Sequence, residues 1–156
     1  GTGPRATSFI PEITVERLDY VVRAHASGAL VDQVFCAFLG SIPREDFVPY
    51  VADFFLQLED VKWTVIAGVV NETLIVSVRN LGYTKNAGEF VRRFFADIGS
   101  AGGHRAMAKA VVPFRAFREK FTVLEGDNIG ARLQALVAQF LHETPAVERR
   151  REPARQ

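Results

Sequence analysis

The chain has 156 residues, of which 48% are apolar, and it carries a formal net charge of +1. This length is enough for one domain with a hydrophobic core, and the apolar content excludes disorder over most of the chain. The near-neutral charge gives no reason to expect general binding to nucleic acid, so any site for an anion has to be local.

The single cysteine, Cys36, lies in an apolar stretch. One cysteine excludes an internal disulfide and a metal site made of several cysteines, and we expect this thiol to be buried and unreactive. No signal peptide is visible, and no apolar run reaches the ~18 residues that a membrane span needs. We therefore expect a cytoplasmic protein with no membrane partner.

The first third of the chain has helical spacing of its apolar residues. Thr14 is placed to cap a helix that Gly28 ends, and Gly40 ends a second apolar segment. Pro43 suits the first turn of a third helix. The sequence thus predicts a helical connector over residues 1–58, with helices at 14–27, 30–39 and 43–58.

After residue 60 the apolar pattern changes to that of strands. Asn71-Glu72 has the length of a hairpin turn, and Asn86 is placed to cap a helix. We predict an α/β fold with a mixed sheet flanked by helices. The strands are expected at 61–70, 73–79 and 107–112, and the helices at 87–98 and 127–143, the last capped by Asp127. Residues 114–121 are expected to form a short helix or a turn.

Two groups of residues suggest an anion site. Alternation along 73–79 places Ser77 and Arg79 on one face near the end of that strand. Gly102 and Gly103, in a predicted loop that starts at the helix-capping Gly99, would let backbone N–H groups approach an anion, and His104 can donate from its ring. Two simpler interpretations stay open. The glycine run can be an ordinary helix C-cap and loop in which His104 has no function, and Arg79 can be a strand-end arginine that only contacts water.

The run Gly99-Ser100-Ala101-Gly102-Gly103-His104, with Met107-Ala108 and Pro113 after it, resembles the glycine-rich histidine motif of DHH-family phosphoesterases. That motif lies in their C-terminal, DHH-associated domain. Upstream, Val76-Ser77-Val78-Arg79-Asn80 resembles the strand-borne serine–arginine motif of the same family. Many members have a longer glycine run before the histidine. The resemblance covers about residues 59–121 and predicts a DHH-associated domain at 59–144. The basic segment at 145–156 has little apolar surface to bury, so we expect it to be a mobile tail.

The resemblance implies that this chain is the substrate-binding piece of a larger phosphoesterase. It assigns the phosphate or nucleotide end of the substrate to Arg79, Gly102, Gly103 and His104, with Ser77 as a weaker candidate. Substrates in the family include short oligoribonucleotides, cyclic dinucleotide products, 3′-phosphoadenosine 5′-phosphate and inorganic pyro- or polyphosphate. The family's N-terminal DHH domain would be the partner of this one and would hold two divalent metals, typically manganese.

Metal ligands are missing from the sequence itself. The histidines at 25, 104 and 142 fall in different predicted elements, and there is no Asp-His-His run or Asp-x-Asp. We therefore expect no catalytic and no metal-binding residue in this chain, and no hydrolysis by this chain alone.

Three further readings stay open. A non-catalytic nucleotide-binding or assembly module would also lack metal ligands, and the phenylalanine-rich helices at 47–58 and 90–98 could pack against a partner. A homodimer is compatible with the sequence as well. The editing domain of alanyl-tRNA synthetases has a similar glycine-rich module, but the helices predicted before residue 58 and the histidine after the glycines argue against it.

Overall fold

The structure is a computed structural model that describes residues 12–143. The predictions for residues 1–11 and for the basic tail at 145–156 lie outside the described residues. Within residues 12–143, no helix is long and apolar enough to cross a membrane. The elements are α1 Val15–Ser27, β1 Ala29–Val31, β2 Val34–Ser41, α2 Phe47–Leu56, β3 Trp63–Val70, β4 Thr73–Asn80, α3 Ala87–Phe95, β5 Ser100–Gly103, β6 Met107–Pro113, α4 Phe114–Lys120 and α5 Ile129–His142.

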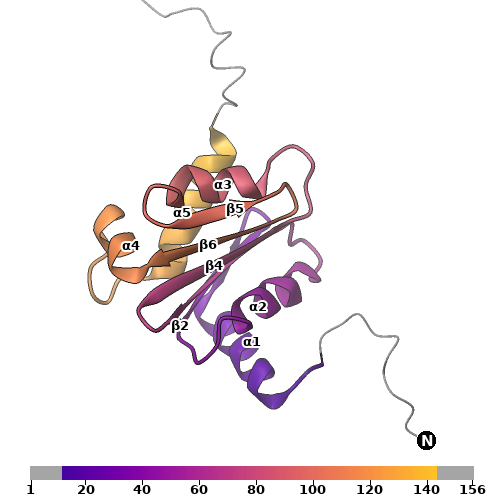
Figure 1. Cartoon of the computed structure of the whole chain (residues 1–156). Helices are drawn as coiled ribbons and strands as arrows, with labels where there is room; N and C mark the ends of the chain where they lie inside the picture. Colours follow the sequence, from indigo (N-terminus) through magenta and orange to yellow (C-terminus); the bar gives the residue numbers. More distant parts are fainter. Residues whose placement is uncertain (1–11, 144–156) are drawn as a thin grey trace, which may run out of the picture.

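The strands form one sheet in the order β1-β2-β3-β4-β6-β5 (Figure 1). Strands β2 and β3 run parallel, while the other neighbouring pairs are antiparallel. Between β3 and β4, Asn71 and Glu72 both have positive φ, as a two-residue type I′ hairpin turn requires. The prediction of an α/β fold with a mixed sheet is confirmed.

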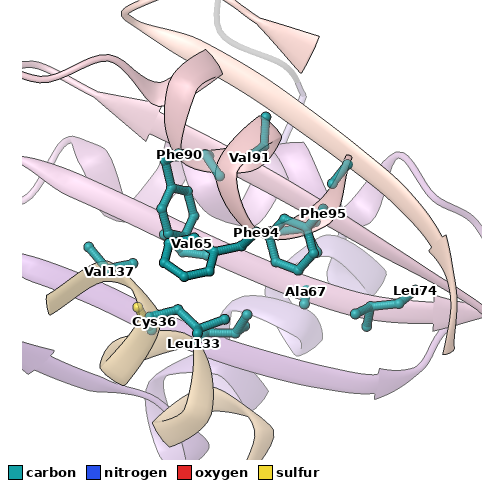
Figure 2. Packing of buried hydrophobic residues seen from close by; sticks show 14 of the residues in the cluster. Cys36, Val65, Ala67, Leu74, Phe90, Val91, Phe94, Phe95, Leu133 and Val137 are labelled. Carbon is teal, nitrogen blue, oxygen red and sulfur yellow. The ribbon is translucent and has the colours of Figure 1, made fainter. Parts of the chain in front are cut away.

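Helices cover both faces of this sheet and form two cores. On one face α3 and α5 pack over the sheet, and Figure 2 shows phenylalanines of α3 beside Leu133 and Val137 of α5. On the other face α1 and α2 pack over alternate residues of the same strands, such as Ile66 and Ile75. Because successive residues of a strand point to opposite faces, neighbours in β4 belong to different cores.

The helix predicted at 30–39 is wrong, because this segment forms β1, a tight turn and β2. Asp32 and Gln33 have φ values of 50° and 69°, so they form another two-residue hairpin turn. Most of β2 is buried on both faces, which removes the alternation that identifies a strand. The division at residue 58 stays a prediction, although β2 is hydrogen-bonded to β3 within one sheet.

Two predicted boundaries near the glycine run are also wrong. Helix α3 ends at Phe95 rather than at residue 98, and Gly99 does not cap it. The predicted loop at 100–103 is the edge strand β5, paired with β6. Gly99 is needed for close packing instead, because a Cβ atom there would lie 2.5 Å from the carbonyl oxygen of Val111.

Capping side chains explain where α1, α3 and α5 begin. Thr14 and Asn86 accept hydrogen bonds from the first turns of α1 and α3, as predicted. Helix α5 is capped by Asn128 and not by Asp127, whose carboxylate accepts from the backbone N–H of Leu124. Helix α2 begins at Phe47, so Pro43 lies before its first turn.

Candidate anion-binding site

Strands β4 and β6 form the floor of a cavity of about 450 Å³. Ser77 lies opposite Lys109 and Arg79 lies opposite Met107, so these four side chains share one face of the sheet. It is the face that carries the α1–α2 core, to which Ile75 belongs. Because α2 packs mainly on β3 and β4, the surface of β6 beyond it is left open.

All the residues predicted for the site line this one cavity: Ser77, Arg79, Gly102, Gly103 and His104. The pairing of β6 with both β4 and β5 brings the two motifs together. One row across the three strands consists of Ser77, Lys109 and Gly102. What these residues bind stays a prediction.

Arg79 is the one charged residue among residues 12–143 that is buried, with 9% of its surface exposed. Its Nε donates to Asp53 Oδ1 at 2.7 Å, and its Nη1 donates to the carbonyl oxygen of Val78 at 3.1 Å. Within the described chain, Nη2 has no hydrogen-bond partner. Nη2 is not among the described side-chain atoms that are buried without a partner, so it is accessible from the cavity, where an anion would be a strong acceptor for it.

The two glycines of the site have different surroundings. At Gly102 a Cβ atom would meet no atom within 4 Å, so this position borders open space. At Gly103 φ is +147°, and a Cβ atom would lie 2.4 Å from the carbonyl oxygen of Met107. Gly102 therefore gives a ligand close access to the backbone, whereas Gly103 is required by the fold of the hairpin.

His104 lies in the turn between β5 and β6. Its backbone N–H donates to the carbonyl oxygen of Met107 at 2.9 Å, and its own carbonyl accepts from Gly88 N at the start of α3, at 3.0 Å. Ring atom Nδ1 accepts from the backbone N–H of Ala106 at 3.3 Å. This geometry assigns the ring proton to Nε2, which leaves one ring donor for a ligand.

Asn80 belongs to the motif at 76–80 but was not predicted as a site residue, and it fixes the turn in position. It is buried, and its Nδ2 donates to the carbonyl oxygens of Lys85 and Arg105 at 2.8 and 3.0 Å. Its Oδ1 accepts from Gly82 N at 2.8 Å. The sequence signal was an asparagine followed two residues later by glycine, which is typical of a turn closed by the asparagine side chain.

Helix α2 and the turn before it form an acidic wall of the cavity. Glu45, Pro49 and Asp53 are spaced by four residues and so lie along one side of this segment. Glu45 Oε1 accepts from Lys109 Nζ at 2.9 Å, across the cavity floor. Glu45 and Lys109 were not predicted from the sequence, although the alternation in β6 places Lys109 on the same face as Met107.

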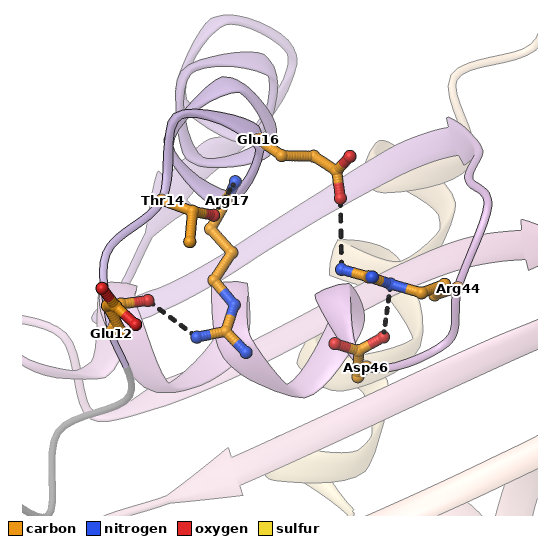
Figure 3. Close-up of polar contacts among 6 residues, drawn as sticks. All are labelled: Glu12, Thr14, Glu16, Arg17, Arg44 and Asp46. Carbon is orange, nitrogen blue, oxygen red and sulfur yellow. Dashed lines mark hydrogen bonds and ion pairs between the residues drawn. The ribbon is translucent and has the colours of Figure 1, made fainter.

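Arg44 holds this wall against α1. Its guanidinium bonds Asp46 at 3.3 Å and Glu16 of α1 at 3.1 Å (Figure 3). Figure 3 also shows Arg17 of α1 reaching back to the carbonyl oxygen of Glu12. All the charged side chains in these pairs are largely exposed, so the contacts orient the wall without adding much stability.

A resident metal does not fit the residues that are present. Across residues 12–143, no three His, Cys, Asp or Glu side chains lie together in a way that could hold a metal ion. The acids nearest the cavity are bonded to arginine or lysine. We derive no chemical step through a metal in this chain.

No known family profile matches the chain. It is 29% identical over 109 residues to an uncharacterized protein of Methanocaldococcus jannaschii, a match that covers 69% of this chain and 22% of that protein. Among solved structures it is similar to an exopolyphosphatase-related protein from Bacteroides fragilis, with a TM-score of 0.56 and 14% identity over 85% of this chain and 38% of that one. A pGpG-specific phosphodiesterase from Vibrio cholerae matches with a TM-score of 0.47 and 9% identity, over 78% of this chain and 39% of that one.

The Bacteroides protein and this chain share a fold. The Vibrio similarity has a TM-score below 0.5 and supports no inference. The chain spans 22% of the length of the archaeal protein and 38% of the Bacteroides one, so it corresponds to a part of each.

Proposed function

We propose that the cavity binds the terminal phosphate of a phosphoester and that this chain is the substrate-binding domain of a larger DHH-family phosphoesterase. The observation that carries the proposal is Arg79, a buried guanidinium with an unused donor at the floor of a cavity. The side chain is mostly buried, but this donor is not enclosed by protein, so a ligand oxygen in the cavity can reach it. The resemblance of the sequence motifs and the fold shared with an exopolyphosphatase-related protein support the same conclusion.

Three groups would hold the phosphate. The free edge of the Arg79 guanidinium and the Nε2–H of His104 would donate charge-assisted or neutral hydrogen bonds. Gly102 would allow the phosphate to approach the backbone of β5. This domain would bind and orient the substrate. Such positioning lowers the entropic part of the activation barrier for a reaction that the DHH domain would carry out.

The proposed partner is the protein's own DHH domain, which would hold manganese and activate water. The proposed substrates are short oligoribonucleotides, nucleoside bisphosphates or polyphosphate, encountered in the cytoplasm. This domain would supply no metal ligand.

Binding can be tested by isothermal titration with a 5′-phosphorylated diribonucleotide, pApA. We expect Arg79→Met and His104→Ala each to weaken binding, the arginine change by roughly tenfold or more. Since Arg79 is buried, Gly102→Val is a second test, because its side chain would enter the open cavity without meeting the protein. Arg115→Met removes a 91% exposed arginine outside the cavity and serves as the control.

If Gly102→Val and His104→Ala bind pApA as tightly as the parent, the cavity is not the phosphate site. An assay of the purified chain with manganese and pApA is expected to show no turnover. In a protein that carries this chain together with the proposed DHH domain, the phosphoesterase proposal predicts hydrolysis. A non-catalytic nucleotide-binding module predicts binding without hydrolysis even there.

A further inference from the structure

Lys109 lies in the middle of the cavity floor, in the row between Ser77 and Gly102. Its ammonium group donates to Glu45 Oε1 at 2.9 Å. We propose that Lys109 is a second anion-binding side chain and that Glu45 is its built-in counter-ion, which a bound phosphate replaces. The inference rests on the proposed function, because it assumes that the cavity takes a phosphate group.

The position of Lys109 relative to Arg79 favours joint binding. Arg79 pairs with Met107, and Lys109 is two residues further along β6 on the same face. Diagonal neighbours of this kind are about 7–8 Å apart. Both side chains are long enough to cover that separation, so they can contact one phosphate group from two sides.

Both cations are already paired with a carboxylate from the acidic wall. Arg79 is bonded to Asp53 and Lys109 to Glu45, and these two acidic side chains are 52% and 58% exposed. Ion pairs of exposed groups contribute little to stability, so exchanging Glu45 for a ligand oxygen costs little. The two ion pairs therefore neutralise the charges of Arg79 and Lys109, while the cavity stays open to a ligand.

Because both cations of the cavity floor already have a carboxylate partner, the site should select ligands by the charge of their phosphate group. A terminal phosphate carries a charge of about −1.5 to −2 near neutral pH, whereas an internal phosphodiester carries a single negative charge. The terminal group competes better with a carboxylate for the two cations. The site is therefore expected to prefer a ligand with a terminal phosphate over an internal diester.

The test compares pApA with ApA, which lacks the terminal phosphate, by isothermal titration of the purified chain. Lys109→Met keeps the length of the side chain and removes its charge. We expect it to weaken pApA binding by roughly tenfold while changing ApA binding much less. Glu45→Gln is expected to have the opposite sign and to strengthen pApA binding by about two- to fivefold.

The double variant Lys109→Met/Glu45→Gln shows whether the two residues act together. If Glu45 acts through Lys109, the gain from Glu45→Gln becomes smaller when Lys109 is absent. Arg115→Met and Glu119→Gln are matched controls, because they change the same charges in an exposed pair outside this cavity. The melting temperature should be nearly unchanged in all of these variants.

Two negative outcomes can be told apart. If Lys109→Met binds pApA like the parent while Gly102→Val and His104→Ala weaken binding, this inference is wrong and the proposed function stands. If the parent chain does not bind pApA, both are wrong. Equal losses for pApA and ApA in Lys109→Met would contradict the preference for a terminal phosphate.

Discussion

Gly102 and Gly103 are adjacent, but substitution should affect them differently. Gly103→Ala is expected to destabilise the fold by about 1–3 kcal/mol or more, because φ is +147° and a Cβ atom would overlap Met107 and Ala108. Gly102→Ala should leave stability nearly unchanged and weaken phosphate binding. Urea unfolding together with titration separates the two effects. Equal stability losses at both positions would contradict the assignment of Gly102 to the ligand.

The environment of Cys36 makes its thiol unreactive towards thiol reagents in the folded protein. It is 1% exposed within the α3–α5 core, and burial raises the pKa of its thiol well above the ordinary value. We expect no modification by a thiol reagent at neutral pH in the folded protein, and rapid modification in urea. Rapid labelling of the native protein would show that this core opens easily.

At the scale of elements, Asn80 connects the end of β4 to the β5–β6 turn. Asn80→Ala would remove the side-chain donor to the Lys85 carbonyl and one of the two donors to the Arg105 carbonyl, which also accepts from Ala87 N, at a total cost of about 1–3 kcal/mol. It should also weaken phosphate binding, because His104 is held by the same turn. Thermal unfolding and titration measure the two effects. Asn80→Asp is a useful comparison, since it keeps the size of the side chain and the acceptor for Gly82 but loses the donors.

Lys120 joins the end of α3 to the end of α4. Its Nζ donates to the carbonyl oxygen of Phe94 and to Asp97 Oδ1, and this bond lowers the pKa of the Asp97 carboxyl below its ordinary value of 3.8. The pKa of Asp97 is lower in the folded protein than in the unfolded chain. Its ion pair with Lys120 therefore stabilises the fold at pH values above the unfolded-state pKa, and this stabilisation is lost as the pH falls through the folded-state pKa.

The corresponding variant is Asp97→Asn. It should be less stable than the parent at neutral pH, and the difference should vanish in acid once the pH has fallen below the folded-state pKa of Asp97. Urea unfolding across this range measures it. A difference that does not change with pH would mean that the carboxylate charge of Asp97 does not contribute.

At the scale of the whole molecule, the sheet depends on residues before position 58. Strand β2 pairs with β3, and α1 and α2 cover the face that includes Ile66 and Ile75. A fragment of residues 59–143 would expose both that face and the edge of β3. We expect the fragment to lack a cooperative thermal transition and to aggregate, as judged by circular dichroism and gel filtration. A soluble, cooperatively folding fragment would support a domain boundary at residue 58.

Much of the fold could be predicted because its signals are local. Alternation and a two-residue turn specify the hairpin of β3 and β4, and capping residues mark the starts of α1 and α3. The shared face of Ser77 and Arg79 follows from the geometry of any strand. The sequence by itself therefore determined the class of fold and identified Ser77, Arg79, Gly102, Gly103 and His104 among the residues that line the cavity.

What the tertiary structure alone decided depends on contacts between distant residues. The segment at 34–41 is a strand because β1 and β3 pair with it on both sides, and its apolar run was equally compatible with a buried helix. Arg79 and its partner Asp53 are 26 residues apart, and Lys109 and Glu45 are 64 apart. No local pattern encodes such pairs, because each partner is specified by how α2 packs on the sheet. Only the tertiary structure therefore shows which carboxylates neutralise Arg79 and Lys109 in the cavity.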